Sequence, residues 1–177
     1  MHLDFSKNHF ELFGLEPRFR LDMARLDGAY LQLQSQVHPD RFANASAAEQ
    51  RLSIQQAARV NEAYQTLKKP LGRARYLLQL HGVDTLEETN TAMPADFLVT
   101  QMEWREAITE AIQTNDHHEL TRLEHDLLHQ TRALENKLED MLDELKNYSE
   151  ASATVRKLKF LEKLNEEIKD AFETLEG

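Results

Sequence analysis

Val37-His38-Pro39-Asp40-Arg41 separates two segments in which apolar residues recur every three or four positions, the spacing of amphipathic helices. The segment before it, residues 22–38, ends at Pro39 because the residue that precedes a proline avoids the α-helical region. The segment after it, residues 46–69, opens with Ser46-Ala-Ala-Glu49, which is a capping box. The sequence therefore predicts two helices, with His38, Pro39 and Asp40 in the loop between them.

Helical patterns also cover most of the remaining chain, and strand patterns are nearly absent. Residues 8–13 and 71–81 predict two shorter helices. A polar stretch without periodicity, residues 83–95, is a candidate linker. Three long helices are expected after it, with breaks near residues 115–116 and 147–149. Short connections make consecutive helices antiparallel neighbours, so the expected fold class is all-α, with a C-terminal three-helix bundle.

The last two bundle helices each carry an apolar stripe, which we expect to be buried against the other helices. In the second helix, residues 116–145, the stripe consists of Leu120, Leu123, Leu127, Leu134, Leu138, Met141 and Leu145. In the third helix it consists of Val155, Leu158, Leu161, Leu164, Ile168, Phe172 and Leu175.

The composition excludes several classes of protein. The chain has 177 residues and no cysteine, which excludes disulfides, thiolate zinc sites and iron–sulfur clusters held by its own cysteines. It shows no signal-peptide pattern at its start and no apolar run of the ~20 residues that a membrane span needs. These features predict a soluble, cytoplasmic protein of one or two domains.

Charge is divided unevenly along the chain. Residues 1–80 hold 11 Lys/Arg and 8 Asp/Glu, a net charge of +3, whereas residues 81–177 hold 10 and 23, a net charge of −13. An acidic half disfavours nucleic acids and anionic membranes as partners, because both carry dense negative charge. The asymmetry indicates two units with different partners.

The first candidate site is His38-Pro39-Asp40. Pro39 stiffens the loop, and the flanking side chains offer a donor/acceptor and a negative charge, a combination suited to a cationic site on a partner. The tripeptide by itself is also compatible with an ordinary turn.

The surroundings of the tripeptide resemble the J-domain of the DnaJ family. Asn8-His-Phe-Glu-Leu-Phe-Gly-Leu15 precedes it and Val60-Asn-Glu-Ala-Tyr-Gln-Thr-Leu67 follows it, in the order of that family's motifs. The resemblance implies an antiparallel helical hairpin with the tripeptide at its tip, where it stimulates ATP hydrolysis by a DnaK-type chaperone. It assigns His38, Pro39 and Asp40 to this contact, together with Arg41 and Arg25. Basic residues are sparser on the second helix than is usual in the family.

The second candidate site lies on the helix over residues 97–114. At 100° per residue its core face holds Phe97, Gln101, Trp104, Ile108 and Ala111. Away from that face lie Leu98, Val99, Met102, Glu103, Glu106 and Glu110, an exposed mixed patch of the kind that marks protein-binding sites. Alternatively, Leu98 and Val99 pack against the linker or the first unit, and the glutamates form a solvated face. Phe160, displaced from the stripe of the third helix, either completes the patch or wedges between helices.

A J-domain followed by an acidic bundle in so short a chain resembles the HscB family, the J-type co-chaperones of iron–sulfur cluster assembly. Phe97-Leu-Val-Thr-Gln-Met-Glu-Trp-Arg-Glu106 is similar to the family's scaffold-binding segment, and residues 154–164 are similar to its C-terminal signature. The resemblance implies a J-domain over residues 1–75, a connecting helix and linker over 76–94, and a bundle over 95–177.

The resemblance also implies partners and roles. An HscA-type chaperone would bind the J-domain, and an IscU-type scaffold would bind Leu98, Val99, Met102, Glu103, Glu106, Glu110 and Phe160. Val99 is shorter than the methionine-type side chain that the family carries there. The chain would be a co-chaperone and not an enzyme, with no cofactor. Two alternatives are a J-protein for another client and a purely structural coiled-coil protein, which leaves the His-Pro-Asp context unexplained.

A third alternative is a small helical metalloenzyme. His118, His125 and His129 share a helix face, and His125-Asp-Leu-Leu-His129 resembles a zinc HExxH site with Asp in place of Glu. A third and a fourth metal ligand are not evident, and the leucine stripe occupies the buried face of this helix. We therefore predict solvated histidines and no metal site.

Overall fold

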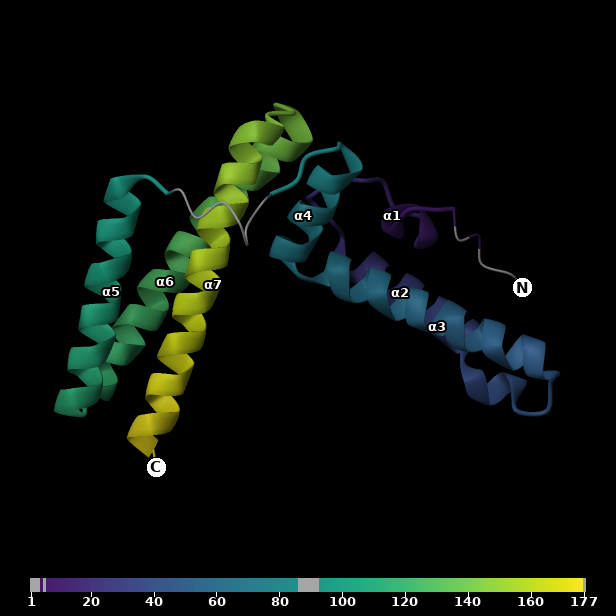
Figure 1. Cartoon of the computed structure of the whole chain (residues 1–177), viewed down its shortest axis with the longest axis horizontal. Helices are drawn as coiled ribbons and strands as arrows, with labels where there is room; N and C mark the ends of the chain where they lie inside the picture. The colour runs from purple at the N-terminus through teal and green to yellow at the C-terminus, as the bar shows by residue number, and fades with distance from the viewer. Residues whose placement is uncertain (1–3, 5, 86–92, 177) are drawn as a thin grey trace. The chain divides into compact units, whose positions relative to one another are not determined.

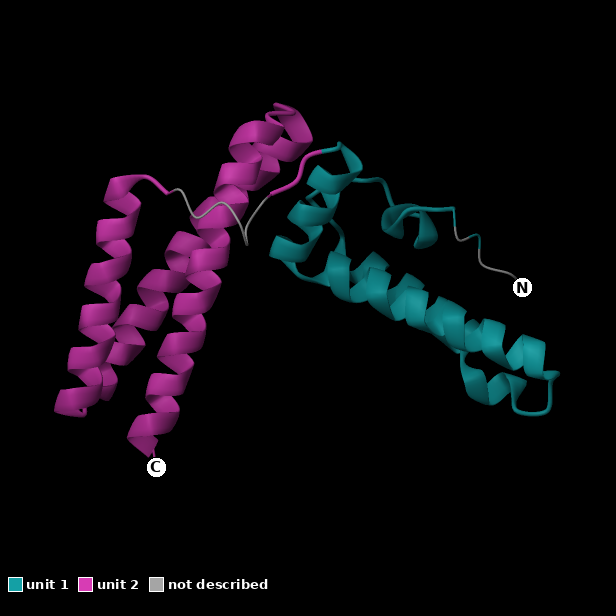
Figure 2. Cartoon of the chain, in the orientation of Figure 1, with its two compact units in different colours: residues 1–82 teal, residues 83–177 magenta. Residues whose placement is uncertain are grey.

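A computed structural model describes residues 4, 6–85 and 93–176, and these residues form helices and connecting loops with no strand among them (Figure 1). The expected all-α fold class is confirmed. The described chain forms two compact units, residues 1–82 and residues 83–177 (Figure 2). The predicted linker falls largely on residues 86–92, which lie outside the described residues.

Unit 1 is built on a helical hairpin. Its elements are α1 (His9–Leu12), α2 (Met23–Val37), the 3₁₀ turn η1 (Pro39–Phe42), α3 (Ala47–Lys68) and α4 (Pro70–Leu80). The Tyr30 hydroxyl on α2 donates to Asn61 on α3, and the Tyr64 hydroxyl on α3 donates to Asp27 on α2. Early residues of α2 therefore meet late residues of α3, so the two helices are antiparallel.

The helix starts of unit 1 follow local signals. Asn8 with Glu11, and Ser46 with Glu49, form complete capping boxes, and the Asp22 carboxylate accepts the Arg25 backbone N–H at 3.2 Å. Each cap satisfies N–H groups that have no partner inside the helix. The predicted starts of all three helices are confirmed.

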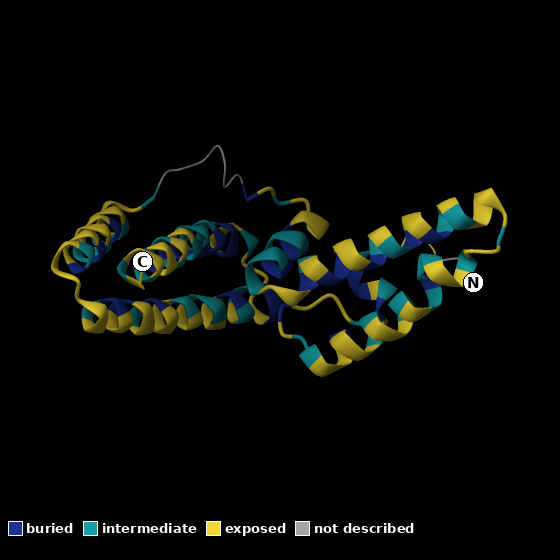
Figure 3. Ribbon diagram, turned by 90° about the horizontal axis from the view of Figure 1, so that it is seen from below, coloured by how far each residue is buried: buried dark blue, intermediate teal, exposed yellow. Residues whose placement is uncertain are grey.

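The core of unit 1 lies where α1, α2 and α4 pack on α3. Its fully buried large side chains come from all four helices. Figure 3 colours the ribbon by burial and shows buried positions in dark blue along helices of this unit. The fully buried large side chains are Phe10, Leu26, Val60, Leu67 and Leu78. These side chains pack α1, α2 and α4 on α3, and α2 gives way to η1 just after the buried Val37.

Unit 2 is a three-helix bundle of α5 (Ala95–Thr114), α6 (His117–Glu139) and α7 (Tyr148–Glu176), in which each helix contacts the other two. Ile108, Leu123, Leu127, Leu161 and Ile168 are among its buried core residues. Asn115, in the left-handed conformation, ends α5. The predicted bundle and most of its stripes are confirmed.

One prediction about the second stripe is wrong. The helix does not run evenly to residue 145, because α6 is followed by a short π-helix, η2 (Asp140–Glu144). The Leu145 N–H bonds to the Asp140 carbonyl, five residues back. This wider turn shifts the register of the face that follows it. Leu145 is consequently 70% exposed, and Leu142 is buried in the core instead.

Candidate protein-binding surfaces

The first surface is the tip of the hairpin in unit 1. Val37, the last residue of α2, is buried and anchors the end of the helix. His38 leaves the helical conformation with ψ near 130°, and Pro39 is the first residue of η1. At that position an N–H would have no partner inside the helix, so proline removes no hydrogen bond. The tripeptide therefore forms the step from an anchored helix end into a tight turn, with His38 as the cap of η1 and Pro39 and Asp40 as its first residues.

His38 and Asp40 have a defined mutual geometry. The Asp40 backbone N–H donates to His38 Nδ1 at 3.3 Å, and the Asp40 carboxylate lies 3.6 Å from the same nitrogen. When Nδ1 of the neutral ring accepts this bond, Nε2 carries the proton and is a donor. The Asp40 side chain is 90% exposed and that of His38 44%. The tip thus places a histidine ring beside a solvated carboxylate, a combination suited to a cationic site on a partner.

The two basic residues assigned to this surface lie in different places. Arg41 is in η1, and its Nη1 donates to the Ser35 carbonyl at 3.1 Å. Arg25 is exposed in the first turn of α2, twelve residues before Val37. At ~1.5 Å per residue it is about 18 Å from the tip along the helix axis. The structure therefore brings Arg41 to the tripeptide but not Arg25.

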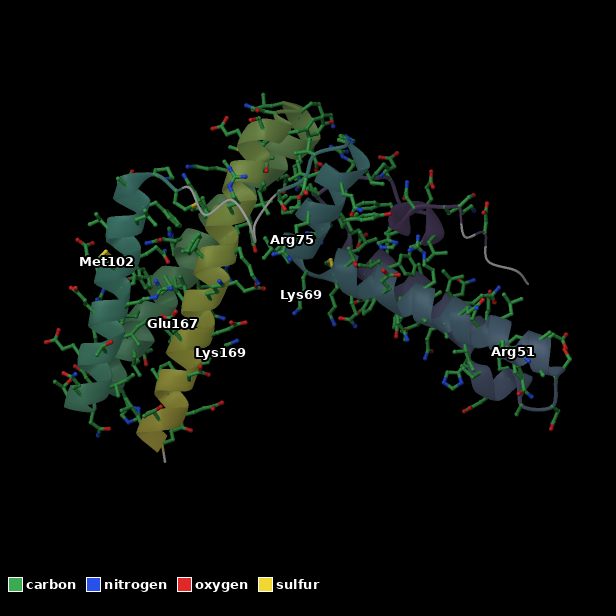
Figure 4. All side chains as sticks on the ribbon, in the orientation of Figure 1. Arg51, Lys69, Arg75, Met102, Glu167 and Lys169 are labelled. Atoms are coloured by element: carbon green, nitrogen blue, oxygen red, sulfur yellow. The ribbon has the colours of Figure 1, made fainter. Side chains whose placement is uncertain are left out.

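The second surface lies on α5, opposite the buried Gln101 and Ile108. Leu98, Val99 and Met102 are 42%, 54% and 62% exposed. Figure 4 shows Met102 on the outer side of α5, away from α6 and α7. The expectation of exposed apolar side chains off the core face is confirmed. We call these three residues the α5 apolar patch.

Three carboxylates flank the α5 apolar patch. Glu103, Glu106 and Glu110 are exposed, and among the described residues they form no ion pair and no side-chain hydrogen bond. Their negative charge is uncompensated by the chain itself. An apolar patch edged by free carboxylates suits a partner surface that is apolar at its centre and basic at its rim.

Phe160 lies at the junction between α5 and α7. Its half-buried ring meets Phe97 edge to face, with ring centroids 6.2 Å apart, and Lys157 Nζ lies 5.8 Å from the Phe97 ring centre on the same junction. Of the two expected roles, the structure supports the wedge between helices. A contact of Phe160 with a partner stays a prediction.

An open groove of about 680 Å³ between α5 and α6 was not predicted from the sequence. Trp104, Ala107 and Leu123 line it together with His125 and His129, and Glu103 links it to the α5 surface. The sequence placed Trp104 on the core face of its helix and gave no signal of a groove beside it. The groove itself depends on how α5 and α6 pack.

The charges along the groove are mostly paired. Arg122 bonds to the carboxylates of Glu119 and Asp126, and its hydrogen bonds lower the pKa of the Glu119 carboxyl below its ordinary value. Glu103 is the groove-lining carboxylate that has no such partner among the described residues. The unpaired carboxylate of the groove therefore comes from α5.

The histidines of α6 are solvated, as predicted: His118, His125 and His129 are exposed. Within the described part of the chain, no three His, Asp or Glu side chains are grouped so that they could hold a metal ion. The metalloenzyme alternative gains no support from this arrangement.

Comparison with known proteins covers the whole chain. This chain is 52% identical over 176 residues to the co-chaperone protein HscB homolog of Aromatoleum aromaticum, in an alignment that covers 99% of each chain. This chain belongs to the HscB family of co-chaperones.

Solved HscB structures share the fold. The chaperone HscB from Vibrio cholerae matches with a TM-score of 0.85 and 36% identity over 96% of this chain and 99% of that one. The human co-chaperone protein HscB matches with a TM-score of 0.89 and 31% identity over 96% of this chain and 84% of that one. A family model described as the HSCB C-terminal oligomerisation domain matches residues 93–169.

Membership of the HscB family confirms the resemblance that the sequence motifs indicate. The expected architecture, a J-domain followed by a helical bundle, is that of the HscB structures. Among the helices that the structure describes, none combines the length and the apolar character that crossing a membrane requires.

Proposed function

We propose that this HscB-family chain stimulates the ATPase of an HscA-type, DnaK-like chaperone through its J-domain and delivers an IscU-type scaffold to that chaperone. It would thereby assist the maturation of iron–sulfur proteins. The observation that carries the proposal is the pair of exposed surfaces, one on each unit, in a chain 52% identical to an HscB homolog over its full length.

The chaperone contact is proposed at His38, Pro39 and Asp40, with Arg41 and Arg25 as flanking basic residues. The partly exposed His38 ring, whose Nδ1 accepts the Asp40 N–H, and the solvated Asp40 carboxylate support this assignment. Such groups recognise an acceptor and a cation on a partner without prior rearrangement, which keeps the cost of binding low.

The scaffold contact is proposed at the α5 apolar patch, at Glu103, Glu106 and Glu110, and at Phe160. The exposure of the patch and the free carboxylates beside it support this assignment. Tethering chaperone and scaffold through one chain raises their effective concentration for each other.

We further propose the division into a J-domain over residues 1–75, a connector over 76–94 and a bundle over 95–177, and we infer that the chain has no catalytic activity of its own. All of α4 falls within unit 1, so the connector would begin inside that helix. The cytoplasmic location expected from the sequence stays a prediction.

Steady-state ATP turnover by an HscA-type chaperone tests the proposal. It is measured with this chain, with an IscU-type scaffold, with both, and with the His38→Gln variant. We expect synergy between chain and scaffold that the variant abolishes. His117→Gln, a change of another exposed histidine, serves as the matched control and should keep the synergy.

Each other outcome has a distinct meaning. Stimulation without any scaffold effect would leave the J-domain role and point to a J-protein for another client. No stimulation by the wild-type chain would contradict the proposed chaperone contact. A large loss of thermal stability in His38→Gln would show that the histidine is structural.

A further inference from the structure

We infer that Arg41 is a positioning residue: its guanidinium ties η1 back to the end of α2 and so holds His38 and Asp40 in place. This inference rests on the proposed function for its consequence but not for its geometry. It gives Arg41 a role inside the chain that the family resemblance, which counts it among the chaperone contacts, does not include.

The reason for the tie lies in the proline. In an α-helix the carbonyl of each residue accepts the N–H of the residue four positions on. For Ser35 that residue is Pro39, which has no N–H. The Ser35 carbonyl is therefore left without its helical partner, and Arg41 Nη1 supplies the missing donor at 3.1 Å.

The tie closes a turn whose other bonds are short-range. The Asp40 N–H reaches His38 Nδ1 at 3.3 Å, and the Arg41 N–H reaches the His38 carbonyl at 3.1 Å. Both bonds lie within η1 and its cap, so they do not set the direction in which η1 leaves α2. Within the described part of the chain, the Arg41 side chain supplies the hydrogen bond that joins the turn to α2, while η1 also packs against α3.

The charge of Arg41 is not required for this bond. Its acceptor is a neutral carbonyl, and among the described residues its guanidinium forms no ion pair. If Arg41 acted only as a charged contact with the chaperone, removing it would leave the free chain unchanged. If it positions the tripeptide, removing it changes the turn before any partner binds.

The test measures the effect of Arg41 variants on the turn in the free chain and on stimulation of the HscA-type ATPase. Arg41→Met removes the donor and the charge but keeps an aliphatic stem, and Arg41→Lys keeps a charged donor. In the free chain we expect Arg41→Met to shift the His38 imidazole NMR signals and to raise amide exchange at residues 40 and 41 about three- to tenfold, the range that one hydrogen bond allows. Stimulation of the HscA-type ATPase at subsaturating chain should fall by a similar factor, and Arg41→Lys should restore most of both.

The matched control is Arg25→Met, in the first turn of α2, which should leave the His38 signals unchanged. Reduced stimulation with unchanged His38 signals and exchange would overturn the inference in favour of a direct contact. Altered His38 signals with full stimulation would overturn it as well, because the Arg41–Ser35 bond would then have no effect on the chaperone ATPase. If the wild-type chain gives no stimulation, the proposed function fails, while amide exchange still decides whether Arg41 holds the turn.

Discussion

The ring of Phe160 on α7 meets the ring of Phe97 on α5 edge to face, with centroids 6.2 Å apart. This contact joins the helix that carries the proposed scaffold site to the longest helix of the bundle. Arg105 and Glu167 join the same two helices farther along, with Arg105 Nε 3.1 Å from both carboxylate oxygens. Phe160 therefore contributes to bundle stability, whatever it contributes to binding.

The first prediction is that Phe97 and Phe160 are energetically coupled. Edge-to-face aromatic pairs contribute about 0.5–1.5 kcal/mol beyond their buried area. In a double-mutant cycle of Phe97→Leu and Phe160→Leu, measured by urea unfolding followed through Trp104, we expect a coupling energy in that range. Additive effects of the two changes would show that the rings do not support each other.

The second prediction separates binding from folding on α5. Changing Leu98, Val99 and Met102 together to Ala should alter the free energy of unfolding by less than about 0.5 kcal/mol per site, because the side chains are largely exposed. Scaffold binding, measured by calorimetry, should weaken at least about tenfold, since a few residues near the centre of an interface carry most of its binding energy. Leu128→Ala, an exposed leucine on α6, is the control and should bind normally. Loss of fold in the triple variant would place the three residues in the core.

The third prediction concerns the free carboxylates. Replacing Glu103, Glu106 and Glu110 by Gln removes negative charge that the chain does not compensate. We expect the association rate with a basic scaffold surface to fall about tenfold at low salt and the difference to shrink at high salt, because exposed charges mainly steer encounter. Stopped-flow mixing, with Trp104 in the adjoining groove as the fluorophore, measures the rate. A rate that does not depend on salt in the wild-type chain would exclude steering.

The fourth prediction is a pH dependence of unit 1. His9 is buried and stacked on Tyr76, with ring centroids 4.1 Å apart. Burial lowers the pKa of His9 below its ordinary 6.5, and the charge of Arg59 lowers it further, against a smaller opposing effect of Glu62. Below about pH 6.5, His9 is therefore protonated in the unfolded chain but stays neutral in the folded chain until the pH falls to its lower folded-state pKa. The free energy of unfolding of unit 1 should fall as the pH drops through that value and level off below the folded pKa.

Urea unfolding of the full chain between pH 5 and 8 checks this expectation. Circular dichroism reports on both units, and the single tryptophan, Trp104, reports on unit 2 alone. His9→Phe, which keeps a stacked ring, should remove the pH step, and His125→Gln should retain it. A step that persists in His9→Phe would assign it to another group.

The fifth prediction uses two glycines that differ in their surroundings. A Cβ on Gly72 in α4 would come within 2.8 Å of the Thr66 carbonyl oxygen, a backbone atom that cannot move aside, whereas a Cβ on Gly28 in α2 would meet open space. Gly72→Ala should destabilise the chain by about 1–3 kcal/mol. Gly28→Ala should stabilise it by about 0.5–1 kcal/mol, because alanine loses less backbone entropy in a helix. Thermal unfolding of both variants provides the comparison, and equal effects would contradict the close approach at Gly72.

Much of this molecule follows from local sequence signals. The capping boxes at Asn8 and Ser46 need only residues three positions apart, and the core face of α5 with Gln101 and Ile108 needs only helical periodicity. The same periodicity placed the α5 apolar patch and its glutamates on the exposed side. These signals were sufficient because a helix determines its own surface from spacing along one segment.

Only the tertiary structure decided the rest. Arg105 and Glu167 are 62 residues apart in the chain, and neither their ion pair, the Phe97–Phe160 contact nor the groove beside Trp104 has a local signature. The sequence determined the helices, their caps and the face that each exposes, because those depend on neighbours within a turn. Packing determined which helix faces meet, that Leu145 after η2 is exposed, and that Arg41 donates to the Ser35 carbonyl. Those features depend on how the helices and the turn are arranged in space.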